Sequence, residues 1–113
     1  MPYIRIDVTE KVDDQLKGFL CMNIADMITV LPGKKISRTM VEIQDGCFIL
    51  YDGSLQKAAK VRVELYKESP FEAKAELTKE ISALLQEKLA IPMERIYVTF
   101  PEYESWGSGG TLK

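Results

Sequence analysis

The sequence contains no histidine, only two cysteines and no long apolar run. The lack of histidine excludes Ser–His and Cys–His nucleophile pairs and the usual zinc ligand sets, so no metal is expected. Cys21 and Cys47 are not spaced as CxxC, and we interpret both as free thiols of a reducing compartment. No apolar run approaches the roughly 20 residues of a membrane-spanning helix, so no membrane partner is expected. Acid–base chemistry would therefore depend on a carboxylate, lysine, tyrosine, cysteine or the amino terminus.

A strong excess of charge of either sign is also absent. The net charge is −2, from 15 basic and 17 acidic residues. A nucleic-acid-binding protein is expected to carry a basic surface, so no nucleic-acid partner is expected. The amino terminus lacks the basic and then apolar pattern of a signal peptide, and we expect a cytoplasmic location. The chain has 113 residues, 46% of them apolar, which suits one domain over residues 1–113.

An internal repeat is present. Residues 3–8 (YIRIDV) align with residues 60–65 (KVRVEL), and residues 17–43 align with residues 74–100, in one register without a gap. Arginine matches arginine and apolar residues match apolar residues along most of this alignment. We therefore divide the chain into two pseudo-repeats, which span residues 2–46 and 59–103.

Each pseudo-repeat predicts a strand, a helix and a second strand. Residues 3–8 and 60–65 alternate apolar and charged side chains, which is typical of a strand with one buried face. The middle of each repeat carries apolar residues at helical spacing. Ser69-Pro70 suits the start of the second helix, and Pro32-Gly33 ends the first one. The closing strands are expected at 40–43 and 95–100.

Two such β-α-β units predict an α+β fold in two layers. The strands of one unit lie parallel and are joined by a right-handed crossover, so the two units form a four-stranded mixed sheet with both helices on one face. Residues 48–51 (FILY) and the tail 104–113 are expected to form short strands that pair with neighbouring subunits. Because the sheet edges would otherwise be exposed, we expect a closed homo-oligomer.

The first candidate for chemistry is Pro2. Removal of Met1 would leave Pro2 with a secondary amine at the start of the first strand, and burial would lower the pKa of that amine. A neutral amine near pH 7 is a competent general base. Lys34 and Lys35 follow the first helix, where one of them could bind a substrate carboxylate. The alternative is a common second-position proline and two solvated lysines.

Aromatic and hydroxyl side chains provide further candidates. Tyr97 and Thr99 could donate hydrogen bonds to a substrate oxygen, or they could simply occupy the polar face of the last long strand. Tyr66 ends the third strand, where it could line a pocket or cover the start of a helix. Trp106, the only tryptophan, could stack on a substrate or attach the Gly/Ser-rich tail to a neighbouring subunit.

Together these features resemble the tautomerase superfamily, and most closely its macrophage migration inhibitory factor branch, which includes phenylpyruvate tautomerase-like members. The resemblance covers nearly the whole chain. It rests on the opening MP, PGKK after the first helix, YDGS at 51–54, the doubled β-α-β pattern, and PMERIYV followed by a Trp-Gly tail. It implies a homotrimer in which three sheets form a barrel, a site between subunits, and no cofactor or metal.

The resemblance also implies keto–enol tautomerisation of phenylpyruvate-like α-keto acids, with Pro2 as the general base. Lys34 would hold the substrate carboxylate, Tyr66 would line the pocket, and the neighbouring subunit would supply Tyr97 and Thr99. Tyr66 and Thr99 depart from the branched aliphatic residue and the asparagine that are often found at these positions. These departures leave the physiological substrate open.

Three alternatives remain at this point. Pro2 could instead act as an acid in a hydratase, dehalogenase or decarboxylase of the same superfamily, for which Arg38 and Glu42 are conceivable partners. The chain could be a non-catalytic trimeric binding or signalling protein. A ferredoxin-like sensing domain shares the doubled β-α-β pattern but gives no role to Pro2.

Overall fold

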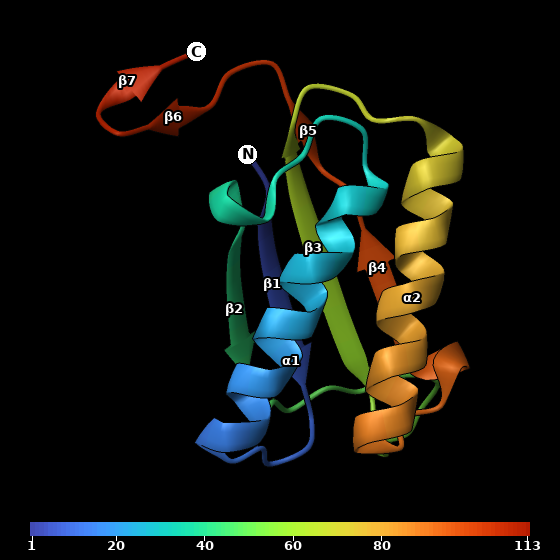
Figure 1. The fold of residues 1–113 in the computed structure, drawn as a ribbon. Coiled ribbons are helices and arrows are strands. Elements are labelled where there is room, and N and C mark those ends of the chain that lie inside the picture. The colour runs from blue at the N-terminus through green and yellow to red at the C-terminus, as the bar shows by residue number, and fades with distance from the viewer.

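The computed structural model describes residues 1–113, and two helices pack on one face of a mixed β-sheet (Figure 1). The main elements are β1 (Tyr3–Val8), α1 (Asp14–Met27), β2 (Met40–Gln44), β3 (Ala59–Tyr66), α2 (Phe71–Leu89) and β4 (Ile96–Thr99). The short elements are the 3₁₀ turns η1 (Ile28–Val30), η2 (Ile36–Arg38) and η3 (Met93–Arg95), and the tail strands β5 (Glu102–Tyr103), β6 (Gly107–Ser108) and β7 (Thr111–Leu112). The predicted α+β architecture is confirmed.

The sheet has the strand order β2–β1–β3–β4, and each repeat contributes one parallel pair. The two central strands, β1 and β3, are antiparallel, and Arg5 lies opposite Arg62, its match in the repeat. Each guanidinium is paired along its own strand, Arg5 with Asp7 at 3.1 Å and Arg62 with Glu64 at 2.7 Å. These pairs offset the repulsion between like charges on facing strands. The repeat in the sequence therefore appears as an approximate twofold arrangement of the sheet.

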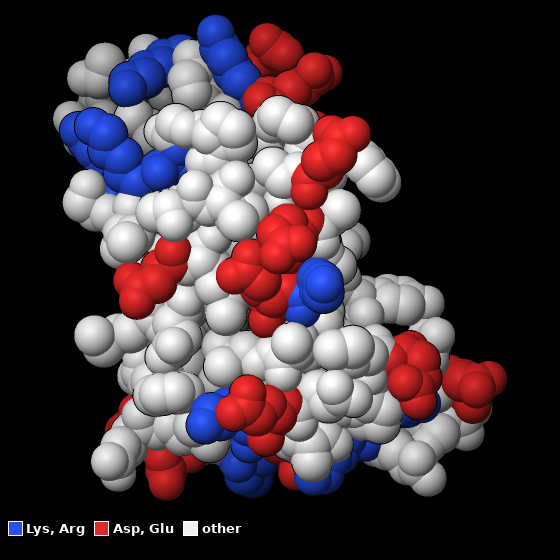
Figure 2. Space-filling model, turned by 45° about the vertical axis from the view of Figure 1, so that its right-hand side comes forward, with Lys and Arg blue, Asp and Glu red and all other residues white.

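Charge on the surface is mixed. Figure 2 shows Lys and Arg side chains in groups at the upper left and at the bottom of one face, with acidic side chains between and beside them. Acidic side chains follow one another from the upper right to the middle of this face, where a basic side chain lies beside them (Figure 2). No helix has the length and the apolar character that crossing a bilayer requires.

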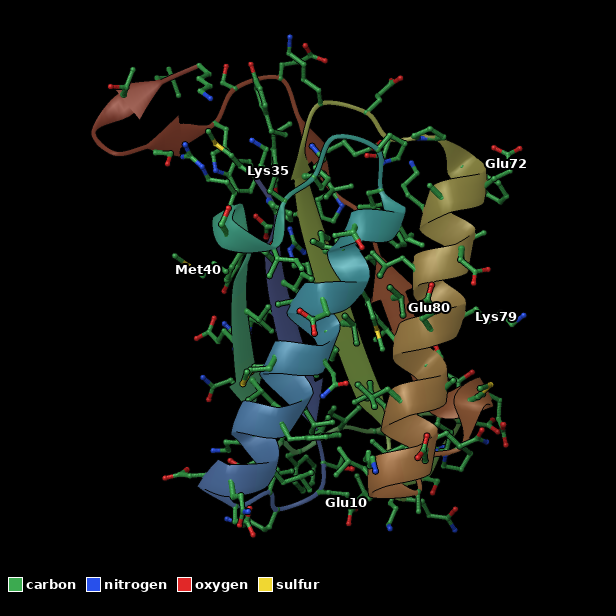
Figure 3. All side chains as sticks on the ribbon, in the orientation of Figure 1. Glu10, Lys35, Met40, Glu72, Lys79 and Glu80 are labelled. Carbon is green, nitrogen blue, oxygen red and sulfur yellow. The ribbon has the colours of Figure 1, made fainter.

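The helix ends follow from local side-chain and backbone chemistry. The Asp13 carboxylate accepts a hydrogen bond from the Leu16 amide at 2.8 Å and caps α1. Helix α2 begins directly after Ser69-Pro70, as predicted, with Glu72 in its first turn (Figure 3). It ends at Ala90, which adopts the left-handed conformation with φ of 56°.

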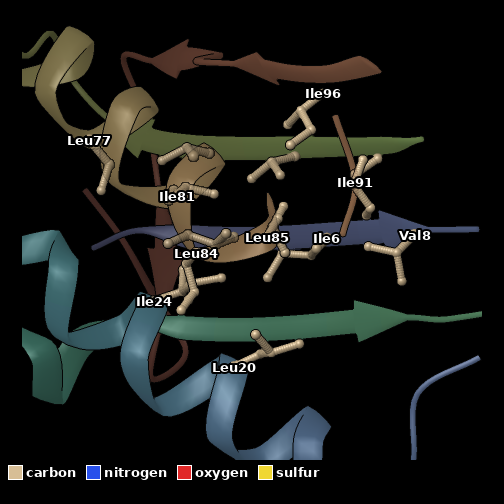
Figure 4. Close-up of a cluster of buried hydrophobic side chains, with 14 of the residues drawn as sticks. Ile6, Val8, Leu20, Ile24, Leu77, Ile81, Leu84, Leu85, Ile91 and Ile96 are labelled. Atoms are coloured by element: carbon tan, nitrogen blue, oxygen red, sulfur yellow. The ribbon is translucent and has the colours of Figure 1, made fainter. Parts of the chain in front are cut away.

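The hydrophobic core lies between the sheet and the two helices (Figure 4). One face of β1 and β3 is fully buried there, and the other face, with Arg5 and Arg62, is left open. Fully burying one large aliphatic side chain contributes about 1.5–3 kcal/mol. The fully buried residues include Ile4, Ile6, Val61 and Val63 of the strands, Leu20 and Ile24 of α1, and Leu77, Ile81 and Leu85 of α2.

Two predicted strand segments differ in the single chain. Within one chain residues 48–51 form no strand, and only Tyr51 forms a bridge, with Ser54. The expected pairing of this segment with a neighbouring subunit stays a prediction. Phe48 and Leu50 are 87% and 67% exposed. The tail instead pairs with itself, because Gly109 and Gly110 have positive φ and form a tight turn between β6 and β7. The resulting hairpin lies beyond the end of the sheet near the amino terminus (Figure 1).

Candidate functional site

Pro2 is buried at the start of β1, where β2 runs beside it. Tyr3 pairs with Met40, and the Met40 amide donates a hydrogen bond to the Pro2 carbonyl at 3.0 Å. Because β2 pairs with β1 in this register, the turn η2, which precedes β2, lies close to the amino terminus. Met1 precedes Pro2 and is half-buried.

A cavity of about 340 Å³ opens beside Pro2, within the size range of small-molecule sites. Three separate parts of the chain form its wall. Arg38 is the only charged side chain in this wall, and no acidic residue contributes to it. The wall consists of Met1, Pro2, Tyr3, Arg38, Met40, Trp106, Gly107, Ser108 and Gly109.

The amine at the amino terminus belongs to Met1, and burial and three cations affect its pKa. Its pKa is lowered first by burial and then by the charges of Lys34, Lys113 and Arg38. Pro2 lies one residue further in and is more buried than Met1. The same causes would therefore lower the pKa of a Pro2 amine after removal of Met1. A lower pKa leaves more of the amine neutral near pH 7, which suits a general base.

Lys34 lies next to this amine but outside the cavity wall. Its ammonium donates a hydrogen bond to the backbone carbonyl of Tyr66 at 2.9 Å. Burial lowers the pKa of Lys34, and the nearby Glu102 partly offsets this effect. Lys35 is exposed and does not line the cavity. Of the two lysines, only Lys34 affects the pKa of the amine at the amino terminus.

Tyr97 and Thr99 are far from Pro2 within one chain. Tyr97 pairs with Lys60 of β3, and Lys60 pairs with Asp7 near the far end of β1. The strand between Pro2 and Asp7 spans about 16 Å at the usual rise per residue. Tyr97 is 58% exposed, and its ring lies edge-on to that of Tyr51 with the centroids 5.4 Å apart. One chain thus gathers Pro2, Lys34, Tyr66 and Trp106, but not Tyr97 or Thr99.

Trp106 belongs to the cavity wall, and its ring also contacts Tyr103, with the centroids 6.2 Å apart. Sequence reasoning did not identify Tyr3 or Met40 as part of the wall. The parallel pairing of the first two strands contains this information, because it aligns residue 3 with residue 40. Arg38, considered only for an acid-catalysed alternative, lies two positions before that pair and lines the cavity.

The sequence model of the macrophage migration inhibitory factor (MIF) family matches residues 1–111. The chain belongs to the MIF family. The crystal structure of Leishmania major MIF2 is 30% identical, with a TM-score of 0.93, and the match covers 100% of this chain and 97% of that one. The resemblance to the tautomerase superfamily and its MIF branch is thereby confirmed.

More distant solved structures share the MIF fold. A MIF homologue from Prochlorococcus marinus is 20% identical, with a TM-score of 0.83 and 97% of each chain covered. Pt0534, crystallised after inactivation by 2-oxo-3-pentynoate, is 19% identical, with a TM-score of 0.83, and 96% of this chain and 92% of that one are covered. No curated protein matches the chain.

Proposed function

We propose that the chain is a cofactor-independent keto–enol tautomerase of phenylpyruvate-like α-keto acids, with Pro2 as the general base after removal of Met1. The observation that carries the proposal is the buried Pro2 beside a small cavity that contains a cation and no acid. Membership of the MIF family and the inactivation of the fold relative Pt0534 by a 2-oxo acid support the same substrate class.

The reaction is a proton transfer without change of composition. The neutral Pro2 nitrogen removes a proton from the carbon next to the keto group, and the electron pair moves to the keto oxygen. Lys34 holds the substrate carboxylate. The hydroxyl of Tyr97 from a neighbouring subunit donates a hydrogen bond to the oxygen on which negative charge develops. Protonated Pro2 then returns the proton to that oxygen.

The cations around the amine favour the role of base over that of acid. Positive charge next to an amine disfavours its protonated form, so Lys34 and Arg38 work against a Pro2 that must start protonated. A hydratase, dehalogenase or decarboxylase that uses Pro2 as an acid would need the opposite environment. We therefore retain tautomerisation as the proposed reaction.

A homotrimer is the assembly that this proposal requires. Tyr97 and Thr99 cannot reach Pro2 within one chain, and Tyr97 is exposed beside the apolar segment that includes Phe48 and Leu50. The outer strands β2 and β4 leave open edges. Three copies around one axis would let each chain complete its neighbour's site, with the open faces of the three sheets forming a barrel.

The proposal is tested by phenylpyruvate turnover on protein whose loss of Met1 is verified by mass spectrometry. Pro2→Gly removes the secondary amine and is expected to lower kcat by about 100-fold or more, the usual contribution of a general base. The folded state and assembly of the variant are checked by circular dichroism and light scattering. Equal turnover by the wild type and the folded variant, or full activity with Met1 retained, would overturn the proposal.

A further inference from the structure

Arg38 differs from the other arginines of the chain in having no partner. Arg5 and Arg62 are paired with carboxylates on their own strands. Arg95, the match of Arg38 in the repeat, donates hydrogen bonds to four backbone carbonyls. The Arg38 guanidinium forms no hydrogen bond or ion pair and lines the cavity beside Pro2. At this matching position, the arginine of the second repeat binds the backbone, whereas the arginine of the first repeat lines a cavity.

The acidic residues near the cavity are already engaged. A neighbouring hollow shares part of the wall and contains Glu42 and Glu64. Glu42 accepts a hydrogen bond from the Tyr3 hydroxyl, and Glu64 is paired with Arg62. Arg38 is exposed and pairs with no carboxylate of the chain, so its guanidinium is free to bind an anion from outside the chain.

The backbone around Arg38 is firmly held. The Arg38 amide donates a hydrogen bond to the Lys35 carbonyl at 3.1 Å, and the Thr39 hydroxyl donates to the same carbonyl at 2.8 Å. Two residues after Arg38, the Met40 amide bonds the Pro2 carbonyl. The guanidinium therefore extends from a fixed turn that is tied directly to the residue proposed as the base.

A second cation approaches the same amine from a different element. Lys34 is held at the end of β3 through the Tyr66 carbonyl and lies outside the cavity wall, whereas Arg38 is inside it. One carboxylate on one side of the amine would engage only one of these two groups. The other cation would then have no anionic partner, whereas a ligand with two carboxylates would engage both.

We propose that Arg38 is a substrate-binding residue and that the substrates are α-keto acids with a second carboxylate. The inference rests on the proposed function and narrows its substrate class. The planar guanidinium can bind a carboxylate through two parallel hydrogen bonds, which Lys34 cannot do. The second carboxylate takes no part in the proton transfer, so the reaction still only moves one proton from carbon to oxygen through Pro2.

The test compares 2-oxoglutarate with 2-oxopentanoate, which have the same chain length and differ by a terminal carboxylate in place of a methyl group. Enolisation is followed for both as exchange of the C3 protons for deuterium by NMR. Wild-type protein without Met1 is expected to show a kcat/KM about tenfold higher for 2-oxoglutarate, the size of a charge-assisted hydrogen bond. Arg38→Gln is expected to remove this preference, so that kcat/KM for 2-oxoglutarate and for 2-oxopentanoate becomes equal within the variant.

Two control variants separate a local contact from the overall charge. Lys79→Gln makes the same charge change on the outward side of α2, far from the cavity (Figure 3), and is expected to keep the preference. Arg38→Lys keeps the charge but not the planar fork and is expected to keep part of the preference. A wild type without preference, or an Arg38→Gln variant with the full preference, would overturn the inference.

Binding provides a readout that does not depend on turnover. Trp106 lies in the cavity wall and is the only tryptophan, so its fluorescence reports occupancy. Glutarate is expected to bind about tenfold more tightly than pentanoate, and Arg38→Gln is expected to equalise the two. If no Pro2-dependent exchange occurs but this difference is found, the tautomerase proposal fails and Arg38 remains an anion-binding residue. Equal binding of both ligands to the wild type would overturn the inference itself.

Discussion

Three cations, Lys34, Lys113 and Arg38, lower the pKa of the amine at the amino terminus in addition to burial, and no carboxylate offsets them. This arrangement favours the neutral amine, which can accept a proton, and it attracts anionic ligands to the same place. The proposed base and the proposed binding site of an acidic substrate would therefore depend on the same charges.

The first residue-scale prediction concerns pH. Burial and three cations lower the pKa of the Met1 amine, and we expect the same direction for the Pro2 amine once Met1 is removed. Because a base is active only when neutral, kcat/KM should rise with pH through a value below the ordinary 7.7–8.0 of an α-amine. The pKa of Lys34 is also lowered by burial, so its charge should be lost below the ordinary lysine range and kcat/KM should fall again. The profile of phenylpyruvate turnover between pH 5 and pH 10 checks both limbs. A flat profile would contradict the assignment.

A second residue-scale prediction separates the two lysines. Lys34→Met removes a cation next to the amine and should raise KM for phenylpyruvate by roughly tenfold or more, because a hydrogen bond to a charged group contributes about 1.5–3 kcal/mol. Lys35→Met, which alters an exposed side chain outside the cavity wall, should change KM by less than about twofold. Steady-state kinetics of both variants decide between them, and the reverse order would show that Lys35 binds the substrate.

At the scale of elements, η3 holds the long segment between β2 and β3 in place. The Arg95 guanidinium donates to the carbonyls of Lys57 at 2.8 Å, Tyr51 at 2.9 Å, Gln56 at 3.1 Å and Ser54 at 3.2 Å. The same group lies over the Tyr51 ring. The segment has almost no strand structure of its own, so this one side chain replaces the ladder hydrogen bonds that a sheet would provide.

Replacing this side chain gives a prediction about stability. Arg95→Met leaves several carbonyls without their donor and should lower the free energy of unfolding by about 2–3 kcal/mol. Arg38→Met changes the matching position of the first repeat, where no contact is lost, and should stay within about 0.5 kcal/mol. Urea unfolding at one fixed protein concentration measures both. Equal effects of the two changes would show that the Arg95 contacts contribute little.

Elements were predictable from the sequence where local pattern decides them. The alternation in β1 and β3 and the apolar stripes of both helices follow from burial on one face, so their types and their pairing within each repeat were correct. Residues 48–51 are apolar and β-prone but have no strand beside them in one chain, which a local pattern cannot reveal. Arg38 and Arg95 match in the repeat, and only tertiary contacts distinguish the free side chain from the bound one.

At the scale of the whole molecule, the candidate site is divided between two ends of the sheet. Pro2 lies at one end, and Tyr97 lies at the other, exposed and packed against Tyr51. Sequence reasoning from the family resemblance assigned both to one site, and their separation within one chain means that the proposed site requires a second copy. The exposed Phe48 and Leu50, next to Tyr51 in the sequence, provide apolar surface for such a contact.

Mixed assemblies test this division of the site. Pro2→Gly and Tyr97→Ala are each expected to be nearly inactive alone. When the two variants are co-expressed with different tags and purified through both, a closed ring allows some interfaces to combine an intact Pro2 with an intact Tyr97 from the neighbour. Every cyclic trimer that carries both tags has one such interface among its three, so roughly a third of wild-type phenylpyruvate turnover should return. Turnover no higher than the average of the two pure variants would contradict a site that Pro2 and Tyr97 of neighbouring chains share.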